Sequence, residues 1–156
     1  MRLTVCLVMS LFILAGCAIK PETGVVSGVD ILEYGFEVQD KNDSDSEVVL
    51  ENSSNIPYKQ ATDYGLRFRL NGEPDGSAAN LKLLWITTPD SRTTKQARSR
   101  VLTRELSMKI GGTYYMTSST IWYGEMRRPY RTKFVIGDND GTIYAEMSFW
   151  IVDDDD

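Results

Sequence analysis

The sequence has 156 residues and a formal net charge of −5 at pH 7, with two cysteines and no histidine. The missing histidine excludes Ser-His-Asp and Cys-His catalysis and histidine-based zinc sites, because each of these needs an imidazole. The acidic balance argues against a nucleic-acid partner, because domains that bind nucleic acid are usually basic. Serine–lysine chemistry, carboxylate pairs and metal sites built from oxygen ligands stay open.

The first element along the chain is a predicted export signal over residues 1–16. Arg2 supplies a positive start, residues 5–14 are apolar apart from Ser10, and two small residues precede Cys17. Charge, a short apolar core and small residues in this order are typical of a secretory signal peptide. The apolar run is too short for a transmembrane helix, which needs about 20 residues.

The segment Leu14-Ala15-Gly16-Cys17 resembles the lipobox of bacterial lipoproteins. The resemblance implies that the peptide is cut before Cys17, that this cysteine is lipidated, and that residues 17–24 form a lipidated tether. Two or more acyl chains hold a protein stably on a membrane, whereas one chain does so only marginally. Ala18 in place of aspartate implies, by the same resemblance, the outer membrane; the periplasmic or surface side stays open. The alternative is an ordinary cleaved signal with an incidental cysteine.

The chain after the signal is long enough for one domain with a hydrophobic core, which we expect over residues 25–152. Cys6 leaves with the signal and Cys17 carries lipid, so no cysteine remains for a disulfide. The stability of this domain must therefore come from packing. Residues 153–156 form an acidic tail.

Short apolar or alternating segments separated by turn residues predict about six to eight strands. In chain order the predicted strands cover residues 29–38, 48–50, 66–70, 81–88, 113–123, 133–136 and 142–152. In the third of these, Leu66, Phe68 and Leu70 alternate with arginines, as in a half-buried strand. The nearly continuous apolar run at 81–88 predicts a central strand.

Turn residues lie between these segments. Residues 52–57 and 71–76 are rich in the Asn, Gly and Pro that turns select, and 137–141 (GDNDG) predict a tight hairpin. Residues 93–108 fit either a helix with a narrow apolar stripe or a strand over 101–110. Because helix-forming segments are otherwise scarce, we predict an all-β fold, a single antiparallel immunoglobulin-like β-sandwich.

The segment at 137–152 (GDNDGTIYAEMSFWIV) is similar to the last hairpin of many exported immunoglobulin-like modules. Together with residues 30–36 (DILEYGF), it resembles a bacterial domain family of unknown function. The resemblance implies a sandwich fold and brings no activity with it.

Positive charge is concentrated in residues 91–133, which hold 10 basic and 2 acidic residues. Arginine binds phosphate and carboxylate groups in a bidentate fork, so this block is the candidate binding surface for a partner. Its candidate residues are Arg92, Lys95, Arg98, Arg100, Arg104, Arg127, Arg128 and Arg131. The partner that we expect is an envelope protein or an anionic envelope polymer. The alternative is that these side chains are solvated or pair with acidic segments of the same chain.

Other candidate sites have simpler explanations. The series Asp40, Asn42, Ser44, Ser46 and Glu51 partly matches a calcium loop, but Asp45 stands where such a loop needs glycine. Residues 138–140 have the composition of a turn. Glu33 and Glu37 share one face of a predicted strand with no reason to be buried. We therefore expect no metal, no cofactor and no catalytic residue.

These observations predict a non-enzymatic, lipid-anchored envelope protein that binds or helps to assemble another envelope component. The membrane, reached through the lipid on Cys17, is its first expected partner. One alternative is a surface-exclusion lipoprotein that blocks a receptor. Another is a cell-wall or lipid-modifying enzyme.

Overall fold

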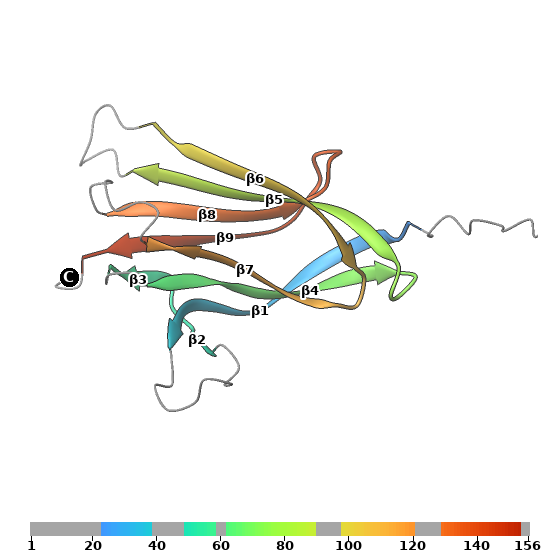
Figure 1. Ribbon diagram of the computed structural model, residues 1–156, viewed down its shortest axis with the longest axis horizontal. Coiled ribbons are helices and arrows are strands. Elements are labelled where there is room, and N and C mark those ends of the chain that lie inside the picture. Colours follow the sequence, from blue (N-terminus) through green and yellow to red (C-terminus); the bar gives the residue numbers. More distant parts are fainter. Residues whose placement is uncertain (1–22, 39–48, 59–61, 90–97, 121–128, 154–156) are drawn as a thin grey trace, which may run out of the picture.

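The computed structural model describes residues 23–38, 49–58, 62–89, 98–120 and 129–153. Within these ranges the chain consists almost entirely of β-strands, which form two sheets (Figure 1). No helix in this part of the chain is long and apolar enough to cross a membrane. The predicted signal, the lipidation site and most of the tether lie outside the described residues.

The smaller sheet has the strand order β2-β1-β4-β7, and its pairings are antiparallel. Its strands are β1 (Val25–Val38), β2 (Val49–Glu51), β4 (Asp63–Glu73) and β7 (Thr113–Ser119).

The larger sheet has the order β3-β9-β8-β5-β6. Its strands are β3 (Asn55–Pro57), β5 (Ala78–Pro89), β6 (Arg100–Lys109), β8 (Tyr130–Gly137) and β9 (Ile143–Val152). All of its pairings are antiparallel except the short parallel one between β3 and β9. The predicted all-β sandwich is confirmed, with this one parallel exception.

Aromatic side chains fill the space between the sheets. Tyr64 of β4 stacks on Phe134 of β8 with their ring centroids 5.9 Å apart. Phe149 of β9 packs edge-on against both, at 5.5 Å from Tyr64 and 5.1 Å from Phe134. All three side chains are buried. Such ring contacts add about 0.5–1.5 kcal/mol per pair beyond the burial of apolar area, so this cluster ties together the two sheets, whose described residues include no cysteine.

The predicted alternation in β4 is confirmed, because Leu66, Phe68 and Leu70 are buried while Arg69 is exposed. The prediction of a central strand is also confirmed. β5 lies between β8 and β6, and every second side chain from Ala79 onward is buried. This strand supplies the floor of the site described below.

The turn predicted at residues 71–76 begins later than expected. Gly72 still pairs with Val26, so β4 continues to Glu73, and the turn is formed by residues 74–77. The N–H of Ser77 donates to the carbonyl of Pro74 at 3.2 Å, and Gly76 supplies the positive φ of 77° that the turn needs. The turn predicted at 52–57 is partly wrong, because its last three residues form β3. Pro57 is tolerated there because β3 is an edge strand.

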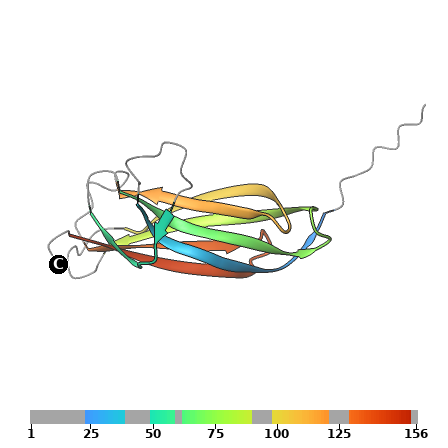
Figure 2. The same cartoon turned by 90° about the horizontal axis from the view of Figure 1, so that it is seen from below.

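The sequence of residues 93–108 fits a helix or a strand, and the structure has a strand from Arg100 onward, while residues 93–97 lie outside the described ranges. β6 pairs with β5 along its whole length, from Arg100 opposite Thr87 to Lys109 opposite Ala78. β6 is the last strand of its sheet, and all of its side chains except that of Met108 are exposed. Figure 2 shows β6 and β7 along one side of the molecule, joined at one end by a short turn.

Candidate functional site

The sandwich is open along the side formed by β6 and β7. Among the described strands, β6 ends the larger sheet and pairs only with β5, whereas β7 ends the smaller sheet and pairs only with β4. Between them lies a groove with a volume of about 710 Å³. We call it the seam groove, and the residues that line it include Leu83, Trp85, Leu102, Arg104, Leu106 and Met116.

The strand register explains which β6 side chains face the groove. Leu102 stands opposite Trp85, Arg104 opposite Leu83 and Leu106 opposite Leu81. Residues directly opposite one another in an antiparallel pair lie on the same face of the sheet, so these three side chains point to the inner face. They do not reach the closed core. Leu102 remains 49% exposed and Leu106 42% exposed, whereas the three β5 residues opposite are buried.

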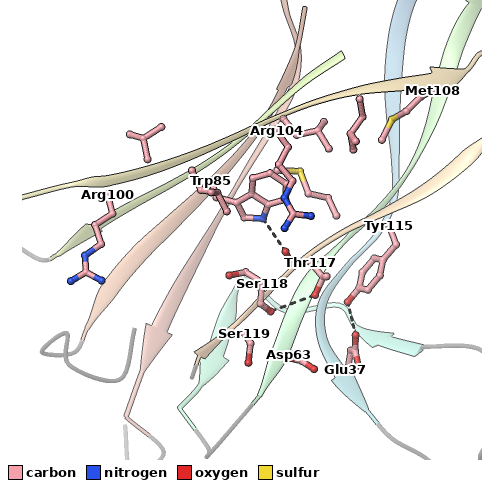
Figure 3. A pocket seen from close by; sticks show the side chains of 15 residues that line it. Glu37, Asp63, Trp85, Arg100, Arg104, Met108, Tyr115, Thr117, Ser118 and Ser119 are labelled. Carbon is pink, nitrogen blue, oxygen red and sulfur yellow. Dashed lines mark hydrogen bonds between the residues drawn. The ribbon is translucent and has the colours of Figure 1, made fainter. Parts of the chain in front are cut away.

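Arg104 sits in the middle of this apolar wall. Its guanidinium carbon lies 6.0 Å from the centroid of the Trp85 ring, within range of a cation–π contact. Figure 3 shows the side chain reaching from β6 over the indole, while that of Arg100 lies apart from it. Among the described residues, no carboxylate forms an ion pair with either arginine. The groove therefore combines apolar area with two arginines that form no ion pair among the described residues, while Glu37 and Asp63 line its other side.

Two side chains bridge the main-chain edges of the seam. The Tyr114 hydroxyl accepts from the N–H of Lys109 at 2.6 Å and donates to its carbonyl at 2.9 Å. The indole N–H of Trp85 donates to the carbonyl of Thr117 on β7 at 2.9 Å. Each strand edge is thus bonded at one point by a side chain from across the sandwich.

These contacts also reveal which β6 main-chain groups point outward. Tyr114 reaches Lys109 on the side away from β5. In an antiparallel ladder, the direction of the N–H and C=O groups alternates from residue to residue. The main-chain groups of Val101, Thr103, Glu105 and Ser107 therefore point to the same open edge, where no described strand pairs with them.

Carboxylates and a phenol lie at the β7 side of the groove. The Tyr115 hydroxyl donates to Oε1 of Glu37 at 2.9 Å. Burial raises the pKa of the Tyr115 phenol well above its ordinary value, and the contact with Glu37 adds to this effect. Glu33 was predicted to share a strand face with Glu37. Its Oε2 lies 3.6 Å from Nη1 of Arg67. The two glutamates are thus held by different partners, and Tyr115 stays a neutral donor.

The structure separates the predicted basic residues. Arg98 is exposed just before β6, and Arg100 and Arg104 line the seam groove. Arg131 lies on the outer face of β8, because its neighbours in the strand are buried, and its guanidinium carbon is 5.8 Å from the Trp150 ring. The remaining four predicted residues, Arg92, Lys95, Arg127 and Arg128, lie outside the described residues. Arg131 therefore does not share a surface with the two groove arginines.

The apolar half of the site was not predicted from the sequence. Arg100, Leu102, Arg104 and Leu106 alternate at every second residue, and this strand pattern could have indicated one mixed basic and apolar face. Trp85 and Met116 come from other strands, so no local pattern connects them with that face. Neither residue was a candidate before the structure brought them together.

The described ranges contain no group of three or more metal-ligating side chains. Asp138, one of the acidic residues of the hairpin, acts as a turn residue. Its Oδ1 accepts from the N–H groups of Asp140 at 3.0 Å and Thr142 at 2.8 Å, and its Oδ2 accepts from the Tyr144 hydroxyl at 2.8 Å. The partial calcium loop lies outside the described residues except for Glu51, which ends β2.

No protein-family model and no curated protein matches the chain. Among solved structures, the chain is similar to an immunoglobulin-like protein from Pseudomonas aeruginosa, with a TM-score of 0.52 and 19% identity, covering 85% of this chain and 98% of that one. It also matches a β-glucosidase from Kluyveromyces marxianus at a TM-score of 0.41 and 10% identity, covering 82% of this chain but 14% of the glucosidase. The first similarity confirms the predicted immunoglobulin-like sandwich, and the second is too weak to support an inference.

Proposed function

We propose that this protein is a lipid-anchored, non-enzymatic module of the cell envelope that binds or helps to assemble another envelope component through the seam groove. One observation carries the proposal. The half-exposed leucines Leu102 and Leu106 flank Arg104, and no described carboxylate pairs with this arginine. A partner that supplied apolar side chains and a carboxylate or phosphate would satisfy both features.

The chemistry of the lining supports binding instead of catalysis. The groove presents aliphatic and indole surface, two arginines, the carboxylates Glu37 and Asp63, hydroxyl groups and the neutral phenol of Tyr115. An activated nucleophile needs a base within hydrogen-bonding reach. Asp63 stands opposite Ser119 in the β4–β7 pair, but among the described residues no hydrogen bond joins the Ser118 or Ser119 hydroxyl to a carboxylate.

Anchoring through Cys17 would place the groove in a definite orientation. The first described residue, Thr23, is six steps along the chain from Cys17, which limits the reach to about 20 Å at roughly 3.5 Å per residue. β1 begins at the end of the sandwich that carries the β4–β5, β6–β7 and β8–β9 turns (Figure 1). In this proposal that end faces the lipid, and the Arg100 end of the groove points away from it.

The anchor and the groove are tested separately. Cys17→Ala should abolish labelling with radioactive palmitate and release the protein from membranes. For the groove, a photo-crosslinking amino acid replaces Leu106 in living cells, in the wild-type background and in an Arg100→Glu/Arg104→Glu background. We expect one crosslinked partner, which the double substitution removes and Arg131→Glu does not.

A crosslink that survives in the double variant would contradict the role of the groove. If the partner were an outer-membrane receptor, the receptor-blocking alternative would be favoured over an assembly role. Circular dichroism and the melting temperature of each variant exclude misfolding as the reason for a lost crosslink.

A further inference from the structure

We propose that the seam groove binds an extended peptide segment, which adds to the open edge of β6 as a further antiparallel strand and turns alternating acidic and apolar side chains toward the groove. This inference rests on the proposed binding function and names the class of its partner. It concerns the main-chain edge as well as the side-chain surface, so it can fail while the binding function holds.

The open edge of β6 supplies the main-chain part of such a site. The N–H and C=O groups of Val101, Thr103, Glu105 and Ser107 point away from β5, and no described strand pairs with them. An unpaired edge of this length is a template for another strand, and peptide recognition by strand addition uses such edges. Beyond Ser107, the Tyr114 hydroxyl already bonds the main-chain N–H and C=O of Lys109, so the edge that is open to another strand ends there.

Exposed apolar side chains mark the same strand as incompletely covered. Val101 is 60% exposed, and Leu102 and Leu106 are about half exposed. By contrast, the inward-facing residues of β5 and β8 are buried. A strand added beside β6 would cover Leu102 and Leu106 with its own inward side chains, next to the wall formed by Met116 of β7.

The register predicts the side chains of the partner. Directly opposite residues interact most strongly across a strand pair, and opposite charges are favoured there. Positions opposite Arg100 and Arg104 should therefore be aspartate or glutamate, and positions opposite Leu102 and Leu106 should be apolar. On the face of the partner that is turned to the groove, which carries every second residue, acidic and apolar side chains should therefore alternate.

Charge complementarity disfavours a second copy of this chain as the occupant. β6 carries Arg100 and Arg104 on its inner face, with Arg98 just before the strand and Glu105 as its single acidic residue. In an antiparallel pair centred on Arg104, the two copies of this arginine would stand directly opposite each other. Like charges in that position are destabilising, so an acidic segment of another protein fits the edge better.

The test uses the full chain, purified from membranes in detergent, and the fluorescent peptide Thr-Leu-Thr-Asp-Thr-Leu-Thr-Asp-Thr. In the expected register the aspartates face the two groove arginines. We expect saturable binding by fluorescence anisotropy. Thr-Thr-Leu-Leu-Thr-Asp-Asp-Thr-Thr has the same composition with a broken alternation, and it should bind at least about tenfold more weakly. Equal binding of the two peptides, or no binding of either, would overturn the proposal.

Methylation of alternate peptide amides tests the strand pairing itself. In the antiparallel register the N–H groups of the threonines point to β6, whereas those of the leucines and aspartates point away. N-methylation of two central threonines should abolish binding, and N-methylation of the neighbouring leucine and aspartate should leave it largely intact. Equal effects of the two modifications would show that the main chain does not pair, and would overturn strand addition.

Charge reversal tests the predicted partner chemistry. Arg100→Glu/Arg104→Glu should weaken peptide binding by about tenfold or more, and a peptide with lysine in place of aspartate should bind this variant better than it binds the wild type. Arg131→Glu makes the same change of charge on the outer face and should have no effect. If the reversal variant loses its fold, Arg100→Gln/Arg104→Gln replaces it with the same expected direction. An equal loss from Arg131→Glu would contradict the groove assignment.

The two proposals fail in different ways. If peptide binding fails while crosslinking from position 106 still depends on Arg100 and Arg104, strand addition is wrong and the binding function stands. If the peptide binds as expected but no partner crosslinks in cells, the groove is a strand-binding site and the envelope function is wrong.

Discussion

The hydroxyl of Tyr114 engages both main-chain groups of Lys109, accepting from the N–H at 2.6 Å and donating to the carbonyl at 2.9 Å. This side chain of β7 thereby makes the two hydrogen bonds to β6 that the main chain of a neighbouring strand would otherwise make. The same ring packs against Phe68 in the core, with the ring centroids 5.8 Å apart. Tyr114 thus fixes the two edge strands to each other beside the turn that joins them.

Tyr114→Phe should lower the free energy of unfolding by about 1–3 kcal/mol, because it removes two hydrogen bonds and keeps the ring. Urea denaturation measures the change. Tyr34→Phe is the matched control, because no hydrogen bond of the Tyr34 hydroxyl is found among the described residues. An equal loss of stability in both variants would show that the edge contact contributes nothing specific.

Gly35 is needed where β1 approaches the end of β2. Its φ is 134°, which residues with a side chain rarely adopt, and an added Cβ would overlap the carbonyl oxygen of Glu51. Gly35→Ala should therefore cost about 3 kcal/mol or more. Gly28→Ala, in the same strand with open space around its Cβ, should change stability by about 0.5 kcal/mol or less. Thermal denaturation of the two variants decides this, and similar melting temperatures would contradict the close approach.

Asp138 makes the stability of the β8–β9 hairpin dependent on acid. The hydrogen bond from the Tyr144 hydroxyl, with those from main-chain N–H groups, lowers the pKa of the Asp138 carboxyl below its ordinary value of about 3.9. A carboxyl whose pKa is lowered in the folded state stabilises the fold at any pH above its ordinary pKa. This stabilisation is lost as the pH falls through the pKa of the folded state. The stability difference between wild type and Asp138→Asn should therefore be largest near neutral pH and shrink below about pH 4.

Asp140→Asn removes the same charge from the same turn, and the Asp140 side chain makes none of these contacts. Its stability difference from the wild type should change little over the same pH range. A parallel change in both variants would assign the effect to overall charge instead of to the Asp138 hydrogen bonds.

Tyr115 should make the free energy of unfolding fall at alkaline pH. Burial, and then the contact with Glu37, raises the pKa of its phenol in the folded state. In the unfolded chain a tyrosine ionises near pH 10, so the folded state holds its proton more tightly and loses stability as the pH rises above that value. Tyr115→Phe should flatten this decline, measured as the urea midpoint between about pH 9 and pH 11. An unchanged slope would contradict the assignment.

The hairpin at 137–141 and the central strand β5 could be predicted because their local patterns agree with their tertiary roles. Gly and Asp in the hairpin meet the backbone needs of a tight turn, and the apolar run of β5 is buried between its neighbours. β6 could not be assigned with certainty, because its lysine, arginine, leucine and glutamate also favour helices. Pairing with β5 determines its conformation, and that contact is not local.

The candidate site was only half predictable for a related reason. Arg131 was predicted to lie with Arg100 and Arg104 because all three belong to one basic stretch of the sequence. Closeness in sequence does not determine on which face of a sheet a side chain lies. Arg131 projects from the outer face and stacks on Trp150. The apolar floor at Trp85 comes from a neighbouring strand, so only the assembled fold reveals it.

The strand order also determines how the chain reaches its native state. β1 pairs with β4, β4 with β7, β5 with β8 and β3 with β9, so most partners are distant in sequence. Domains dominated by such non-local pairings typically fold in milliseconds to seconds, because long loops must close before the non-local contacts form. The β5–β6 and β8–β9 hairpins can form early, which leaves the edge of β6 unpaired throughout the slow search. An unpaired edge is a template for pairing between copies, and the net charge of −5 favours repulsion between them during this search.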